Sequence, residues 1–192
     1  MTSAPAAPRY AVHPTPLGDA FLVVGAHGLM RLTMLDAPLE HVLTDTGVDL
    51  RAVPVHDPSA VADVAAQLDE YFAGDRRDFD VPIDWSFARG FALAALQAVC
   101  TVPYGETASY AEIAALAGSG RAHRAVGTAC AHTPVSIVLP AHRIVRADGS
   151  IGEYGGHPER KRYLLDLEAG MAPGRSPGPF PVVDGSRPSR GQ

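Results

Sequence analysis

Hydrophobic and polar positions follow two periods in the first half of the chain. Residues 15–34 contain two runs rich in β-forming residues, separated by Gly25 and the His27-Gly28 pair, which predicts a β-hairpin. Asp57-Pro58 then offers a helix cap and an early helical proline. Hydrophobic residues recur at helical spacing up to Gly74, at Val61, Val64, Leu68 and Phe72. This half therefore predicts a small sheet with a helix on it.

Helical spacing dominates the second half. From Ser86 an apolar stripe runs up to Pro103 and the tight turn at Pro103-Tyr104-Gly105, with Phe91, Leu93, Leu96 and Val99 on one face. Ser109-Tyr-Ala-Glu112 is a capping-box pattern that begins a short helix ending at Gly118, and residues 121–131 can form another. Two short helices joined by a glycine-containing turn predict helix-turn-helix geometry.

The remaining signals divide the chain. Pro134 ends the second short helix, Ile137-Val138-Leu139 predicts a short buried run, and Pro158 and Gly170 bracket a final helix. The polar stretch 76–85, which contains Pro82, predicts a boundary. We therefore expect an amino-terminal α/β domain over residues 10–85, a second domain over residues 86–170, and a flexible Pro/Gly-rich tail over residues 171–192.

Composition indicates a globular protein. The 192 residues are 46% hydrophobic and 19% charged. We find no apolar run of the roughly 18 residues that a membrane span needs and no signal-peptide pattern at the start, so we expect a cytoplasmic monomer with no membrane partner. Cys100 and Cys130 have neither metal-ligand nor disulfide-framework spacing, so we expect no metal site.

The charge is distributed unevenly. The net charge of −5 argues weakly against nucleic acid, but residues 121–163 contain seven Lys or Arg against three acids, a balance of +4 that leaves −9 for the rest. That asymmetry fits a protein with one surface facing phosphates, although a basic run is more often an ordinary solvated face. The basic residues are Arg121, Arg124, Arg143, Arg146, Arg160, Lys161 and Arg162.

Five ordered motifs carry a family resemblance. They are similar in order and spacing to the O6-alkylguanine-DNA alkyltransferase family, and they lie at residues 102–114, 124–127, 140–145, 152–156 and 160–168. Residues 15–18 and 68–74 resemble the family's amino-terminal domain, so the resemblance covers residues 13–170. It implies an α/β (α+β) protein: a small ribonuclease H-like domain of sheet and helix, then a helical winged helix-turn-helix domain that binds DNA and contains the active site.

The resemblance implies a one-way transfer that uses no cofactor. In the family a flipped O6-alkylguanine gives its alkyl group to a cysteine thiolate, which a neighbouring imidazole and a carboxylate activate. By the resemblance His142 is that imidazole and Glu168 that carboxylate, in a set of contacts that includes a water in the family. Ala141 stands at the nucleophile's position. A methyl side chain cannot form a thioether, so we expect no alkyl transfer.

The resemblance also implies contacts with double-stranded DNA. Tyr110 matches the aromatic residue that meets a rotated phosphate, and Arg124 matches the arginine that fills the space left by the flipped base. The implied DNA surface comprises Tyr110, Arg124, Ala125, Gly127, Thr128, Ala129 and Arg143. The implied lesion pocket comprises Val138, Leu139, Pro140, Tyr154, Gly155 and Gly156, with Tyr154 beside the guanine O6 and Ala141 leaving room for its substituent.

Several residues depart from the family pattern. Thr133 stands where family members commonly have Asn, Leu96 where they usually have Trp, and His157-Pro158 where a third glycine tends to follow. Glu153 is an unusual acid so near a DNA-facing pocket. One engineered Cys→Ala change would not produce these other differences, so they favour a naturally diverged, transferase-dead relative.

We therefore hold three hypotheses. In the first, the chain is an alkyltransferase-like protein that flips and shields O6-alkylguanine without transferring its alkyl group, and so marks the lesion for another repair pathway. Its partners would be nucleotide excision repair proteins, and when bound it would lie on nucleoid DNA. In the second, it is a genuine methylated-DNA–protein-cysteine methyltransferase, a Cys-to-Ala mutant in which the acceptor cysteine at position 141 was replaced to stop the reaction. In the third, the scaffold acts on a small molecule, with His142 as base and Glu168 as its orienter.

Overall fold

The computed structural model describes residues 6–171, which form two compact units. The first unit runs up to Ala88 and also includes Thr133–Val138. The second unit comprises Arg89–His132 and the chain from Leu139 onward. Apart from Met171, the predicted tail lies outside the described residues.

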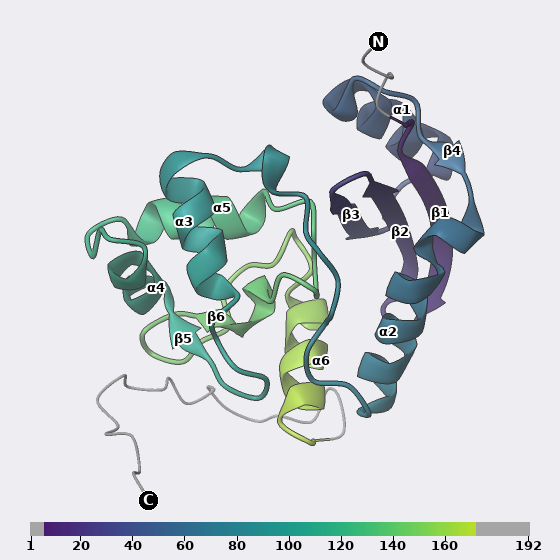
Figure 1. Cartoon of the computed structure of the whole chain (residues 1–192). Coiled ribbons are helices and arrows are strands. Elements are labelled where there is room, and N and C mark those ends of the chain that lie inside the picture. Colours follow the sequence, from purple (N-terminus) through teal and green to yellow (C-terminus); the bar gives the residue numbers. More distant parts are fainter. Residues whose placement is uncertain (1–5, 172–192) are drawn as a thin grey trace, which may run out of the picture. The chain divides into compact units, whose positions relative to one another are not determined.

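The first unit is built on a four-stranded sheet (Figure 1). Its strands are β1 (Arg9–Thr15), β2 (Gly18–Gly25), β3 (Gly28–Met34) and β4 (Val55–His56), in the order β3-β2-β1-β4. The pairs β1/β2 and β2/β3 are antiparallel, whereas β4 runs parallel to β1. The predicted hairpin is confirmed as β2 and β3. Its turn requires Gly28, because φ is 121° and a Cβ there would lie 2.1 Å from the Pro82 carbonyl oxygen.

Two helices accompany this sheet. The predicted helix is α2 (Ala62–Ala73), preceded by a short 3₁₀ helix at Pro58–Val61, whose cap, the Asp57 carboxylate, accepts the Ala60 N–H at 3.3 Å. It ends at Gly74 with φ 84°, as the glycine signal predicts. The other helix, α1 (Leu39–Leu50), was not predicted, because Pro38 makes no side-chain cap and Gly47 interrupts the helical spacing.

A later segment of the chain completes the first unit. Thr133–Val138 lies along β3, where Leu32 N–H donates to the Pro134 carbonyl at 2.9 Å and Ser136 N–H donates to the Leu32 carbonyl at 2.8 Å. Ile137 is buried with φ 65°, a conformation that a β-branched residue rarely adopts. This segment of the first unit thus contains a strained backbone position at Ile137.

The second unit contains four helices in its described part. They are α3 (Gly90–Val99), α4 (Tyr110–Leu116), α5 (His123–Ala131) and α6 (Pro158–Glu168). The strands β5 (Ala108–Ser109) and β6 (Ile144–Val145) pair in parallel. The predicted capping box is confirmed: Ser109 Oγ accepts the Glu112 N–H at 3.2 Å, and the Glu112 carboxylate accepts the Ser109 N–H at 2.6 Å. With α4 and α5 in contact, the predicted two-helix element is present.

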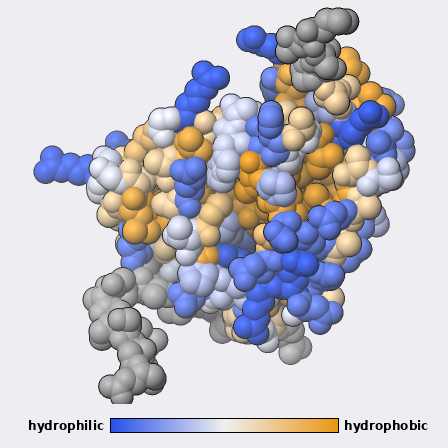
Figure 2. Space-filling model, viewed as in Figure 1, coloured by the Kyte–Doolittle hydropathy of each residue, from blue (hydrophilic) through white to orange (hydrophobic). Residues whose placement is uncertain are grey.

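Each unit has its own buried hydrophobic residues. The sheet buries Ala20–Val23, and the helices of the second unit bury residues that include Leu96, Ile113, Val126 and Leu164. Hydrophobic and hydrophilic residues are interspersed on the face shown in Figure 2. Within residues 6–171 we find no helix with the length and apolar character of a membrane span. The predicted α/β class is confirmed.

Candidate active site

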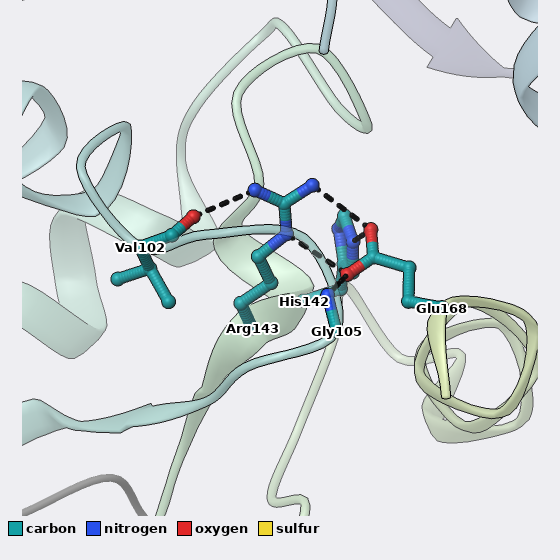
Figure 3. A network of polar contacts seen from close by, with 5 residues as sticks. All are labelled: Val102, Gly105, His142, Arg143 and Glu168. Atoms are coloured by element: carbon teal, nitrogen blue, oxygen red, sulfur yellow. Dashed lines mark hydrogen bonds and ion pairs between the residues drawn. The ribbon is translucent and has the colours of Figure 1, made fainter. Parts of the chain in front are cut away.

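Three segments of the second unit bring the candidate catalytic residues together (Figure 3). A short 3₁₀ helix, Ala141–Arg143, follows Pro140 and leads directly into β6. Helix α6 ends at Glu168, and the turn after α3 supplies Val102 and Gly105. The fold therefore joins residues that are 25 to 63 positions apart in the sequence.

Glu168 is the centre of this network. Its Oε1 accepts from His142 Nε2 at 2.8 Å and from Arg143 Nη2 at 3.0 Å. Its Oε2 accepts from Arg143 Nε at 2.9 Å and from the Gly105 N–H at 3.2 Å. The side chain is only 1% exposed. These four donors explain how an anion is tolerated in the last turn of a helix, where the macrodipole opposes it.

The network holds Glu168 as a carboxylate. Burial alone would raise the pKa of Glu168, but the hydrogen bonds and positive charge of its partners lower that pKa well below its ordinary range. Burial lowers the pKa of His142, and Arg143 and Lys161 add to this, whereas Glu168 opposes it. At neutral pH the site therefore contains an ionised Glu168 and a neutral His142.

This charge state fixes the tautomer of His142. An ionised carboxylate can only accept, so Nε2 of the neutral ring must carry the proton and Nδ1 must carry the lone pair. Nδ1 is buried and makes no hydrogen bond within residues 6–171. The structure thus presents a buried, oriented base, which is the group that activates a thiol or a hydroxyl.

The residue next to this base has no nucleophilic atom. Ala141 is buried, with 3% of its surface exposed. Cys130 lies on α5, where burial raises the pKa of its thiol to about 11, so this thiol is protonated at neutral pH, the unreactive form. Cys100 follows α3 and is exposed, outside the network around Glu168. Residue 141, next to His142 in the sequence, therefore offers no nucleophilic atom that could accept an alkyl group.

Arg143 does not lie where we predicted. We assigned it to the DNA surface, but its side chain is only 7% exposed. Besides its two bonds to Glu168, it donates from Nη1 to the Val102 carbonyl at 2.7 Å, and its guanidinium lies 5.8 Å from the centroid of the Tyr104 ring. Arg143 is thus part of the buried network and is not available to a phosphate. The sequence did contain a signal for this pairing: Glu168 is an acid at the end of a predicted helix, where a positively charged partner would be expected.

One further residue of the predicted DNA surface, Ala129, and one residue of the basic stretch, Lys161, are buried. Ala129 faces the inside of the unit and is 8% exposed. Lys161, which we counted in the basic stretch, is fully buried and donates from Nζ to the Ile144 carbonyl. On α5 the exposed predicted residues are Arg124, Ala125 and Thr128, and Gly127 lies beside the Tyr110 ring. Apart from the buried Ala129, the DNA contacts predicted on α5 stay a prediction.

The predicted pocket residues occupy different environments. Leu139 and Pro140 are buried immediately before Ala141. Tyr154 is half-buried, and Gly155 and Gly156 are exposed with φ of 57° and 83°. Val138 belongs with the first unit. No group of His, Cys, Asp and Glu within residues 6–171 could hold a metal ion.

Sequence reasoning missed two contributors to the site, Val102 and Gly105. Both act through the backbone, which sequence patterns do not show. Gly105 has φ 77°, and a Cβ there would lie 3.1 Å from the Glu168 carbonyl oxygen. The tight turn that brings its N–H to Glu168 therefore depends on glycine.

The lowered pKa of His142 predicts how stability depends on pH. Because the unfolded chain takes up a proton near the ordinary pKa of about 6.5 and the folded chain does so only at lower pH, stability is full above that value and falls as pH decreases. We expect urea unfolding to show a loss between about pH 7.5 and pH 5 of at most about 1.4 kcal/mol per pH unit from this group. The lowered pKa of Glu168 also makes stability fall as the pH decreases, but this loss begins only below the ordinary glutamate pKa of about 4.3.

The matched control is His142→Gln, whose amide can still donate to Glu168 but does not titrate. Its stability should fall less than that of the unaltered protein over the same pH interval, since the other histidines are common to both. Equal pH slopes would contradict a buried neutral His142.

Comparison with known proteins now bears on this site. The model of the 6-O-methylguanine DNA methyltransferase ribonuclease-like domain matches residues 9–85, and that of the DNA binding domain matches residues 90–170. The methylated-DNA–protein-cysteine methyltransferase of Mycobacterium tuberculosis strain H37Rv is 40% identical over 169 residues, covering 86% of this chain and 94% of the relative. The protein of the same name from Methanosarcina barkeri is 31% identical over 159 residues, covering 83% and 96%.

A solved structure gives the same result. The crystal structure of Mycobacterium tuberculosis OGT in complex with DNA has a TM-score of 0.72 and 38% identity, and the match covers 86% of this chain and 96% of that one. The predicted order, a sheet-containing ribonuclease-like domain before a helical DNA-binding domain, is confirmed. By both domain models and by relatives that match along most of their length, this chain belongs to the 6-O-methylguanine DNA methyltransferase family.

Proposed function

We propose that this chain recognises O6-alkylguanine in duplex DNA at a methyltransferase-type site that lacks its acceptor thiol, so that it holds the lesion without taking the alkyl group. The observation that carries the proposal is the buried His142, which Glu168 holds and whose Nδ1 makes no hydrogen bond in the described residues; the residue before it in the sequence is the buried Ala141. A buried nitrogen without a hydrogen-bond partner costs stability, so the unpaired Nδ1 does not stabilise the fold and is better explained by a role in the site.

The charge distribution supports DNA as the ligand. By sequence the first unit has five Lys or Arg against thirteen Asp or Glu, a net charge of −8, and the second has eleven against eight, a net charge of +3. A duplex is therefore attracted to the second unit. Arg124, Ala125 and Thr128 form its exposed helical face, and small neighbours beside one arginine suit insertion into a DNA groove. The relative from M. tuberculosis was solved in complex with DNA.

The comparisons favour the second of our sequence hypotheses over the first. The relatives named above are methylated-DNA–protein-cysteine methyltransferases that match over both domains. We infer that the site is a transferase site altered at its acceptor position, and that the His142–Glu168 pair retains its activating geometry. Nucleotide excision repair proteins were the partners of the first hypothesis, and the comparisons give them no separate support.

The proposal predicts binding without modification. With a duplex containing O6-methylguanine we expect a Kd at least about 10-fold below that of the undamaged duplex, because only the lesion base should be held extrahelically. After incubation, intact-mass measurement should show no added methyl group. Equal Kd values for the two duplexes would remove the proposed specificity, and a methyl adduct on Cys100 or Cys130 would contradict the absence of transfer.

Arg124→Ala tests whether α5 makes the contact. If Arg124 fills the space left by a flipped base, its loss should weaken lesion binding by about 10-fold or more. The control is Arg76→Ala, which removes the same charge from the acidic first unit, where Arg76 pairs with Glu70 at 2.6 Å. Equal effects of the two substitutions would count against base flipping at α5.

A further inference from the structure

Arg146 is an exposed cation on a rigid turn. It follows β6, and its backbone N–H donates to the Ser150 carbonyl at 2.9 Å while its carbonyl accepts from the Gly149 N–H at 2.9 Å. The Asp148 carboxylate accepts the Ser150 N–H at 2.9 Å and closes the same turn. Within residues 6–171 the Arg146 guanidinium makes no hydrogen bond or ion pair, with Asp148 or with any other acid. Its backbone is fixed, and its five N–H donors remain available.

The side chain of Arg146 lies beside the hydroxyl of Tyr110, across a space that Gly152 leaves open. A Cβ on Gly152 would lie 3.6 Å from Arg146 Nε and 3.8 Å from Tyr110 Oη. An atom at the position of this absent Cβ would therefore lie close to both Arg146 Nε and Tyr110 Oη. In the described part of the chain the Tyr110 hydroxyl has no hydrogen-bond partner. A donor from α4 and a cation from the turn after β6 thus face a common space.

The charge around this space favours an anion. Lys161 Nζ lies over the Tyr110 ring, 5.9 Å from its centroid, so a second cation is close to this residue. Asp148 and Glu153 are the acids nearest in sequence, and both are exposed. Asp148 accepts the Ser150 N–H and interacts electrostatically with Arg146, but it makes no ion pair with it. A phosphate oxygen accepts well from a guanidinium and a phenol together, and a phosphate at 0.15 M salt still retains strong attraction for a cation in direct contact.

The family resemblance already places a backbone phosphate at Tyr110; we propose that Arg146 is a second residue that binds a backbone phosphate of the lesion-containing strand there, beside the Tyr110 hydroxyl. This inference rests on the proposed function, because it takes its ligand, duplex DNA, from there. In the sequence Arg146 was only one of the seven basic residues of the stretch 121–163. The structure now makes it, in place of Arg143, the arginine of this segment that DNA can reach. Arg143 and Arg146 are three positions apart, yet one is buried against Glu168 and the other is open to solvent.

The test compares Arg146→Ala with Arg146→Lys, and uses Arg76→Ala as the matched loss of charge from the first unit. For Arg146→Ala we expect Kd for the O6-methylguanine duplex to rise about 5- to 20-fold, and for the undamaged duplex by a similar factor, because a phosphate contact carries no base information. The slope of log Kd against log salt should fall by about 0.9, the value for one phosphate. Arg146→Lys should keep the slope and lose only part of the affinity.

A scan with single methylphosphonates along the lesion strand identifies the phosphate. One position should weaken binding of the unaltered protein and leave the Kd of Arg146→Ala nearly unchanged, since the contact is already lost. An unchanged salt slope in Arg146→Ala, or equal losses at every position in both proteins, would overturn the assignment. The proposed function fails separately, if the unaltered protein does not distinguish lesion from undamaged duplex.

Discussion

Ala141→Cys should convert this protein into a stoichiometric alkyl acceptor. We expect the variant to gain close to one methyl group per molecule from an O6-methylguanine duplex, where the unaltered protein gains none. The physical reason is that a base that could activate a thiol is already oriented: Glu168 holds His142, and His142 Nδ1 has no hydrogen-bond partner in the described residues. Intact-mass measurement, followed by peptide mapping of the modified residue, checks the result.

The rate in that background should depend on His142. Replacing it by Gln in the Ala141→Cys protein removes the base and should slow transfer by about 100-fold or more, the usual contribution of general base catalysis. Ala141→Ser is the matched control for size, because a hydroxyl is a much weaker nucleophile than a thiolate and should give no adduct.

A folded Ala141→Cys protein that binds the lesion but does not transfer would contradict our choice between the hypotheses. It would mean that departures such as Thr133 and Glu153 have remodelled the site for binding alone. The comparisons favour the opposite outcome, since the matching relatives are methyltransferases over both domains.

Local signals predicted the elements of this fold well where one residue decides the geometry. The Ser109/Glu112 capping box and Gly74 at the end of α2 lie where the sequence placed them. The same approach missed α1, which has no side-chain cap, and β1, whose sequence contains Pro14. Both elements depend on tertiary packing, since β1 is central in the sheet between β2 and β4.

For the site, the sequence predicted the pair but not its surroundings. The family motif identified His142 and Glu168, and the structure brings them to 2.8 Å. The sequence alone could not distinguish buried from exposed cations, because Arg143, Arg146 and Lys161 all appear as members of one basic stretch. Burial decides their roles: Arg143 stabilises a carboxylate, Lys161 lies over the Tyr110 ring, and Arg146 remains open.

The second large effect should come from breaking the Arg143–Glu168 pair. Arg143→Met removes two of the donors to Glu168 and the positive charge beside its buried carboxylate, while His142 and Gly105 still donate to it. Because an uncompensated buried charge is costly, we expect the free energy of unfolding to fall by about 3–5 kcal/mol. Glu168→Gln should also destabilise strongly, since it leaves the Arg143 guanidinium buried without its counter-ion. Urea unfolding followed by far-UV circular dichroism measures both losses.

The double variant Arg143→Met/Glu168→Gln separates the ion pair from simple loss of packing. With both charges gone, neither is left buried alone, so the combined loss should be smaller than the sum of the single losses by about 2 kcal/mol or more. Strictly additive losses would mean that the two side chains contribute independently, and that Glu168 is held mainly by His142 and the Gly105 N–H. Coupling of the expected size would establish that Arg143 keeps Glu168 ionised behind His142, the condition that fixes the lone pair on Nδ1 and makes the site ready for a thiol at residue 141.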